Sequence, residues 1–303
     1  MKRNSISYIP IIVFILAAIA VIQFSMKFRT IPTTQTSFVA TEVHRVNAKP
    51  SQHKVRLPIV MYHSVLKSRQ GQYIVSPLQL ENDFKHFVEA GFVAVSVQQL
   101  IDFADGTGAL PEKPILITFD DGHYNNMYYA LPLLQKYKLH AVVNVIGRFS
   151  QYTTESGDAH NPNYSHLTWD EIAQLSTENV MEIGNHTYNM HNYKPRYGVQ
   201  RLCSESDEQY KTALQNDVEK LQRKLLETTG KQCRCFAYPF GKYSKISEEV
   251  LNKMGFAVTL TCNEGISEVE FGNSCSLKLL KRINRSGLYD TQTLLNKIDK
   301  YYS

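Results

Sequence analysis

The chain has 303 residues, of which 43% are hydrophobic and 20% charged, a composition sufficient for one large buried core. Its net charge of +5 is spread along the chain, without the dense Lys/Arg stripe interleaved with aromatics that a nucleic-acid groove needs. Nucleic acid is therefore excluded as an expected partner. The five cysteines, an odd number without CxxC spacing, likewise exclude a zinc ribbon.

The first expected element is a membrane anchor. The run from Tyr8 to Phe24 has no charged residue and is close to the lower length limit for spanning a bilayer. No small-residue cleavage site follows it directly, so an uncleaved anchor is favoured over a cleaved signal. We therefore divide the chain into a membrane anchor or signal region at 1–29, a basic polar tether at 30–56 and one catalytic domain at 57–303.

Past the tether, short apolar runs alternate with helical patterns, which predicts an α/β fold. Strands are expected at 57–62, 93–97, 115–119, 141–146, 180–183, 235–238, 257–261 and 277–283. Helices are expected at 78–90, 127–137, 168–175, 207–229, 246–254 and 291–301, and long loops at 148–166 and 192–209. About seven parallel strands in one unit favour a (β/α) barrel over an open sheet, because the candidate catalytic residues come from the ends of many strands.

Two adjacent carboxylates, Asp120 and Asp121, follow the apolar run 115–117, at a position where α/β enzymes hold their chemistry. Farther along, His186 and His191 again follow a short apolar stretch. Asp-Asp-Gly alone is also a common turn, but one aspartate with two histidines makes a metal set of catalytic type. We expect a metal-dependent hydrolase with a divalent ion, most simply Zn²⁺, which would also relieve the repulsion between the two aspartates.

Three motifs resemble signature motifs of the polysaccharide deacetylases, carbohydrate esterase family 4, over roughly residues 57–285. These motifs are Thr118-Phe119-Asp120-Asp121-Gly122, His186-Thr187-Tyr188-Asn189-Met190-His191 and Phe236-Ala237-Tyr238-Pro239-Phe240-Gly241. The resemblance implies a distorted (β/α) barrel and metal-assisted removal of an acetyl group from a sugar amide or ester. By position it implies that Asp120 is the general base and that the backbone N–H of Phe240 is an oxyanion donor. It also implies that Asp121, His186 and His191 bind the metal.

The spacing of the two histidines departs from the family's usual form, in which they lie four residues apart. A separation of five would splay them on a regular helix, so this segment is expected to be irregular. The wider spacing resembles the deacetylases of poly-β-1,6-N-acetylglucosamine, which also begin with a strand like Ile59-Val60-Met61-Tyr62-His63. In that subgroup the early histidine is the general acid, which implies this role for His63. The alternative for His63 is a structural strand residue.

The family's third motif usually carries an arginine two residues before its proline, but here Ala237 stands at that position. Arg282 is the expected substitute that holds Asp120, with a surface salt bridge as the alternative. We expect a membrane-anchored, extracytoplasmic N-deacetylase of a cell-surface polysaccharide, either poly-N-acetylglucosamine or peptidoglycan. A glycan-binding pseudoenzyme, suggested by Ala237 and by the absence of the usual late histidine motif, and an O-acetyl esterase are the alternatives. A cytoplasmic amidase is disfavoured by the anchor.

Overall fold

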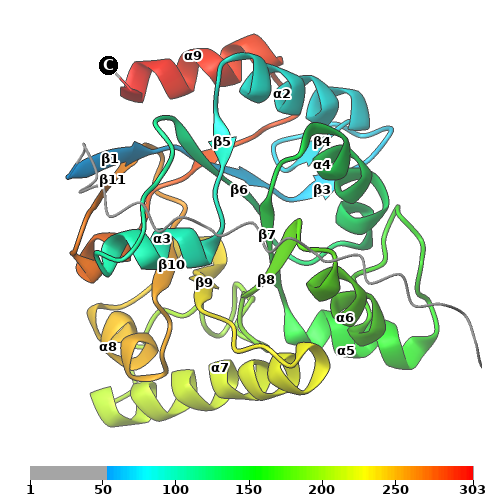
Figure 1. Ribbon diagram of the computed structural model, residues 1–303. Helices are drawn as coiled ribbons and strands as arrows, with labels where there is room; N and C mark the ends of the chain where they lie inside the picture. Colours follow the sequence, from blue (N-terminus) through cyan, green and yellow to red (C-terminus); the bar gives the residue numbers. More distant parts are fainter. Residues whose placement is uncertain (1–52, 303) are drawn as a thin grey trace, which may run out of the picture. The chain divides into compact units, whose positions relative to one another are not determined.

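The computed structural model describes residues 53–302, so the expected anchor and most of the expected tether lie outside the described residues. Its main sheet is parallel, in the order β10-β9-β8-β7-β6-β2-β12, with β5 paired to β6 beside this path (Figure 1). Its strands are β2 Ile59–Tyr62, β5 Val93–Ala94, β6 Pro114–Phe119, β7 Ala141–Val145, β8 Met181–Asn185, β9 Cys235–Ala237, β10 Val258–Leu260 and β12 Ile283–Asn284.

The closing segment, residues 278–282, is irregular, precedes β12 and connects the two edges of this curled sheet. The N–H of Leu280 donates to the Thr259 carbonyl at 2.8 Å, and the Leu280 carbonyl accepts from Thr261 N–H at 2.9 Å. Ile283 and Asn284 then pair with β2 at the opposite edge. The sheet is therefore closed on this side by hydrogen bonds outside the regular ladder, and the expected distorted α/β barrel is confirmed.

Two small sheets flank the barrel. Strand β1, Lys54–Leu57, pairs antiparallel with β11, Ser267–Glu270. Strand β3, Ser64–Val65, pairs with β4, Ile74–Val75. Residues 54–56, which the sequence assigns to the tether, thus form part of a strand in the folded body.

Helices cover the outside of the sheet, with α2 beside α9 and α7 beside α8 (Figure 1). Their bounds are α2 Pro77–Glu89, α3 Val97–Ala104, α4 Leu131–Tyr137, α5 Gly147–Ser156, α6 Trp169–Thr177, α7 Asp207–Thr229, α8 Lys245–Lys253 and α9 Thr291–Tyr302. Short turns of other types are the π-helix Asn126–Ala130 and the 3₁₀ helices Pro239–Gly241 and Ser274–Leu277. Ser76, Ser96, Thr168 and Ser206 begin α2, α3, α6 and α7 with capping boxes, which satisfy backbone donors at each helix start. Within residues 53–302, none of the helices combines the length and apolar character needed to span a bilayer.

Three expected elements differ from the structure. The expected strand 93–97 is only two residues long, because Ser96 caps a helix that starts at Val97. The expected loop 148–166 contains helix α5, whose polar sequence lacks a clear apolar period. The expected strand 277–283 is a strand only at its last residue, since Leu277 ends a 3₁₀ turn and Leu280 lies in the closing segment.

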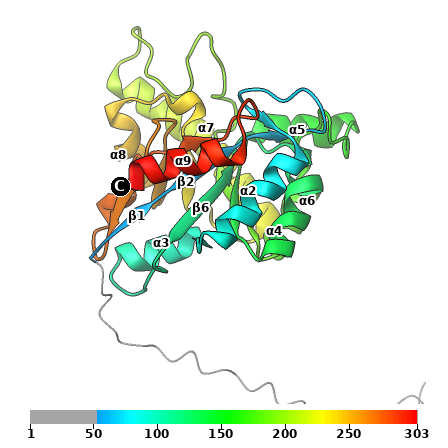
Figure 2. The ribbon, with the colours of Figure 1, turned by 90° about the horizontal axis from the view of Figure 1, so that it is seen from above.

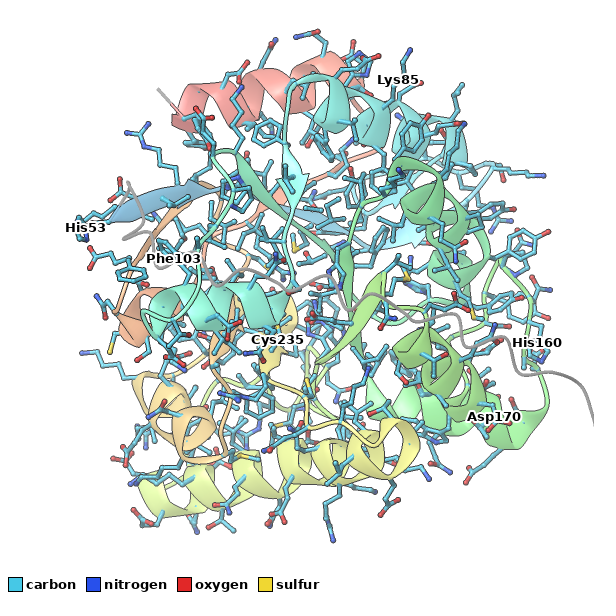
Figure 3. All side chains as sticks on the ribbon, in the orientation of Figure 1. His53, Lys85, Phe103, His160, Asp170 and Cys235 are labelled. Carbon is cyan, nitrogen blue, oxygen red and sulfur yellow. The ribbon has the colours of Figure 1, made fainter. Side chains whose placement is uncertain are left out.

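Successive side chains along each strand of the sheet alternate between two apolar layers, as expected for a parallel sheet that is buried on both faces. Ile115, Ile117 and Phe119 of β6 face the outer layer under the helices, whereas Leu116 faces the layer inside the barrel. Cys235 belongs to the inner layer and lies near the centre of the molecule in Figure 3. This two-residue period directs polar residues at the carboxyl ends of the strands into the mouth of the barrel.

Candidate active site

The three expected metal ligands lie together at the carboxyl ends of β6 and β8. Oδ1 of Asp121 is 3.7 Å from Nε2 of His186 and 3.3 Å from Nε2 of His191. In the described part of the chain this Oδ1 is buried and has no hydrogen-bond partner. Zinc bonds of about 2.0–2.2 Å in tetrahedral geometry put neighbouring ligand atoms roughly 3.3 Å apart. The three residues therefore fit a divalent ion and could hold one.

The imidazole of His186 is oriented for ligation by the backbone of β9. Its Nδ1 donates to the Ala237 carbonyl at 2.7 Å, which leaves Nε2 directed at Asp121. Burial lowers the pKa of His186 to about 4, although the neighbouring aspartates oppose this shift, so the ring is neutral as a metal ligand must be. Burial would raise the pKa of Asp121, but the imidazoles of His123 and His63 hold it well below its usual range.

The segment between the two histidines is irregular, as expected from their spacing. Thr187 has a φ of 72°, in the left-handed region, and the chain turns there instead of continuing into a helix. Asp217 of α7 accepts hydrogen bonds from the N–H groups of Tyr188 at 2.8 Å and Asn189 at 2.9 Å. A half-buried carboxylate on the long helix α7 thus holds the loop that brings His191 back to Asp121.

The structure places Arg282 against Asp120 in a two-point contact. Its Nη1 donates to Oδ1 of Asp120 at 2.8 Å and its Nη2 to Oδ2 at 2.7 Å. Both side chains are buried, so this is not the surface salt bridge considered as the alternative. Burial would raise the pKa of Asp120, but the Arg282 guanidinium and the nearby histidines hold it well below its usual range. Asp120 is therefore ionised, as a general base must be.

Asn144 of β7 also holds Asp120 and is not apparent as a site residue from the sequence. Its Nδ2 donates to Oδ1 of Asp120 at 2.8 Å, and its side chain is fully buried. Gly184 on the neighbouring strand makes room for it, since a Cβ there would lie 1.9 Å from Oδ1 of Asn144. The available signal is a polar residue inside the apolar run 141–145.

A cleft of about 570 Å³ opens over these residues. It is lined by Asp120, Asp121, His186, His191, His63 and Phe240, together with residues of the loops that follow β8 and precede α9. Figure 2 shows these loops, yellow-green and red, at the same edge of the molecule. The cleft therefore unites all the expected site residues except Arg282, which lies beneath Asp120 without lining the cleft.

His63 and Phe240 lie in this cleft with different supports. The His63 ring is 4.7 Å from that of Tyr73, and burial lowers the pKa of His63 although Asp121 and Asp120 oppose the shift. A lower pKa makes the protonated ring a stronger acid but less populated at neutral pH. Phe240 has a φ of 56°, and its ring centre is 4.3 Å from that of His191. Left-handed backbone at a bulky residue costs free energy and is concentrated at functional sites.

Three further side chains, Tyr193, His123 and His160, lie at different distances from the site. Tyr193 stacks on Phe240 at 4.5 Å between ring centres and is 70% exposed, so it offers an aromatic face at the cleft. His123 approaches Oδ2 of Asp121 at 3.6 Å but does not line the cleft. His160 lies at the periphery of the molecule and contacts Glu171 at 2.6 Å (Figure 3).

Comparison with known proteins agrees with this geometry. The family model described as polysaccharide deacetylase matches residues 107–259, half of the chain. The chain is 24% identical to the poly-beta-1,6-N-acetyl-D-glucosamine N-deacetylase of Escherichia coli K12 over 88% of its own length, but it spans only 42% of that relative. Among solved structures it is similar in fold to a de-N-acetylase from Aggregatibacter actinomycetemcomitans, with a TM-score of 0.67, 22% identity and coverage of 82% of this chain and 100% of the other. It is also similar in fold to IcaB from Ammonifex degensii, with a TM-score of 0.66, 23% identity and coverage of 80% and 97%. The chain belongs to the polysaccharide deacetylase family.

Proposed function

We propose that the protein is a metal-dependent hydrolase that removes N-acetyl groups from N-acetylglucosamine units of a cell-surface polysaccharide. One observation carries this proposal: an Asp-His-His set that fits a metal lies beside an aspartate held ionised by Arg282, in a cleft that also contains His63. Hydrolysis of an amide needs a base for water, stabilisation of the oxyanion and a proton for the leaving amine, and this cleft contains a candidate for each.

The residues of the chain have separate tasks in this reaction. A divalent ion bound by Asp121, His186 and His191 would supply an activated water and polarise the acetyl carbonyl. Asp120 accepts a proton from the water as the water oxygen bonds to the carbonyl carbon. The N–H of Phe240 donates to the carbonyl oxygen as negative charge develops there. His63 then protonates the sugar nitrogen while the C–N bond breaks, and acetate and the free amine leave.

Poly-N-acetylglucosamine is the first substrate to test, with peptidoglycan second. The E. coli relative is named for deacetylating that polymer, and the five-residue histidine spacing resembles its subgroup. Tyr193 adds support for a sugar substrate, because an exposed aromatic face at the cleft can pack against the apolar face of a pyranose ring.

Acetate release from a panel of acetylated glycans tests the activity, with Asp120→Asn as the inactive control. Release from N-acetylated β-1,6-glucosamine oligomers that stops on addition of a chelator is the expected result. Release from O-acetylated glycans alone would make the protein an esterase. Binding of glycan without any release would make it a pseudoenzyme, an alternative that the contact of Arg282 with Asp120 disfavours.

We also propose that the apolar run 8–24 anchors the protein with its catalytic domain outside the membrane. The expected cellular result is that protease added to intact cells degrades the catalytic domain while a cytoplasmic marker survives. Full protection of the domain until the cells are lysed would contradict this topology.

A further inference from the structure

The imidazole of His63 lacks the kind of hydrogen bond that orients His186. Nδ1 of His186 donates to a backbone carbonyl, whereas Nδ1 of His63 is buried and has no hydrogen-bond partner within residues 53–302. The ring centre of Tyr73 lies 4.7 Å from that of His63, but this ring contact does not fix the direction of either imidazole nitrogen. The position of the His63 ring therefore depends on how firmly its own backbone is held.

Two consecutive asparagines hold that backbone. Nδ2 of Asn126 donates to the His63 carbonyl at 2.7 Å. Asn125 accepts from the N–H of Val65 at 2.9 Å, and its Nδ2 donates to the Ser64 hydroxyl at 2.9 Å. Both asparagines are at most 2% exposed, so their side-chain amides are held away from bulk water. All three residues from His63 to Val65 are thus tied to one pair of amides.

The same pair belongs to the loop that carries the other reacting groups. Asn125 follows Asp120 by five residues, and Asn126 begins the π-helix Asn126–Ala130, an unusual turn often found at functional sites. Nδ2 of Asn125 also donates to the Pro162 carbonyl at 3.0 Å, which braces the loop from a third segment. The clamp, Asn125 with Asn126, therefore sets the strand end of His63 relative to Asp120 and Asp121.

We infer that Asn125 and Asn126 are positioning residues that place His63 for proton transfer to the leaving amine. This inference rests on the proposed function, in which His63 is the acid. Displacement of a reacting group by about 1 Å can lower a rate by two orders of magnitude. Loss of the clamp should therefore slow only the step that His63 serves.

The experiment compares two substrates in the full-length protein loaded with zinc. An N-acetylated β-1,6-glucosamine oligomer has a poor amine leaving group that requires protonation, whereas the phenolate of an aryl acetate does not. Asn126→Leu should lower kcat on the oligomer about tenfold or more, change kcat on the aryl acetate less than about twofold, and leave both KM values and the zinc content unchanged. His63→Ala should show the same selectivity, and the double variant should be no slower on the oligomer than His63→Ala alone.

Controls separate positioning from loss of stability. Leu175→Ala, on the buried face of α6, should lower the melting temperature without changing the ratio of the two activities. If Asn126→Leu does not fold, Asn125→Ala replaces it, because that change frees the Val65 N–H and the Ser64 hydroxyl. Equal losses on both substrates, or additive losses in the double variant, would overturn the clamp. A wild-type protein that releases no acetate from any N-acetylated glycan would instead overturn the proposed function, and the clamp with it.

Discussion

At the scale of single residues, the site consists of buried charges whose partners come from distant strands. The motifs led to the prediction of Asp120, Asp121, His186 and His191 as site residues, because the spacing within each motif is local, and the structure brings all four into one cleft. Arg282 was predicted only as a substitute for a missing arginine, and its two-point contact with Asp120 required the closing segment of the barrel. Asn144 was not predicted, since nothing in the linear sequence relates this residue near the end of β7 to Asp120, which directly follows β6.

Removal of Arg282 should destabilise the protein more than removal of an arginine from a surface salt bridge would. Arg282→Ala leaves the Asp120 carboxylate buried without its partner, and we expect the free energy of unfolding to fall by about 3–5 kcal/mol in urea denaturation. Arg282→Lys keeps the charge but loses the planar fork, so it should fold better than Arg282→Ala yet lose at least about tenfold in kcat. Lys253→Ala, which breaks an exposed pair with Glu249, is the control and should leave stability nearly unchanged. Equal stability of the alanine variant and the wild type would refute a structural role for this pair.

Metal content gives a direct check of the ligand set. His186→Ala and His191→Ala should each reduce bound zinc from about one per chain, because a site of three protein ligands retains only two. Met190→Ala is the matched control, because Met190 occupies the position that a four-residue spacing would use. The zinc content of this variant should stay near that of the wild type. Elemental analysis after dialysis measures all three, and the reverse pattern would show that the ligands are misassigned.

At the scale of elements, local signals predicted some boundaries well and missed others. Helix α7 was predicted with its observed bounds, since Ser206 caps its start and Gly230, with a φ of 68°, ends it. Helix α5 was missed, because packing against α6 and not an apolar period identifies it. The loop after β8 was correctly expected to be irregular. Its anchor was not predicted, because Asp217 lies on α7, 29 positions after Tyr188 and 28 after Asn189.

Asp217 should therefore control metal affinity from a distance. Asp217→Ala removes the acceptor for the N–H groups of Tyr188 and Asn189, so His191 loses its fixed place, and zinc affinity should fall about 10–100-fold, as for other residues that orient ligands. Glu219→Ala, an exposed carboxylate two positions along the same helix, is the control. Zinc titration with a competing chelator measures both variants. Identical affinities would mean that the loop keeps its shape without this anchor.

At the scale of the whole molecule, the two ends of the barrel differ in chemistry. The carboxyl ends of the strands carry the candidate active site, and the alternation of strands and helices was sufficient to predict this arrangement. The amino ends of β7, β8 and β9 surround a second cavity of about 510 Å³, lined by His140, Glu182 and Cys233 among others. Because no reacting group of the proposed mechanism lines this cavity, we attribute its titratable residues to stability and not to catalysis.

His140 should make the whole fold sensitive to acid. Burial lowers the pKa of His140 to about 4. The Glu182 carboxylate lies 3.6 Å from His140 but does not reverse this shift, and burial raises the pKa of Glu182 as well. In the unfolded chain the pKa is about 6.5, so as the pH falls below 6.5 the unfolded state binds a proton that the folded state does not. The stability contributed by neutral His140 is thus present above pH 6.5 and is lost as the pH falls towards 4. At about 1.4 kcal/mol for each unit of difference between the two pKa values, the total loss is about 3 kcal/mol. Urea denaturation of metal-free protein should show a smaller decline over this range for His140→Gln than for the wild type. His166 and His186 contribute equally to both proteins, so parallel pH profiles would rule out His140 as a source of acid sensitivity.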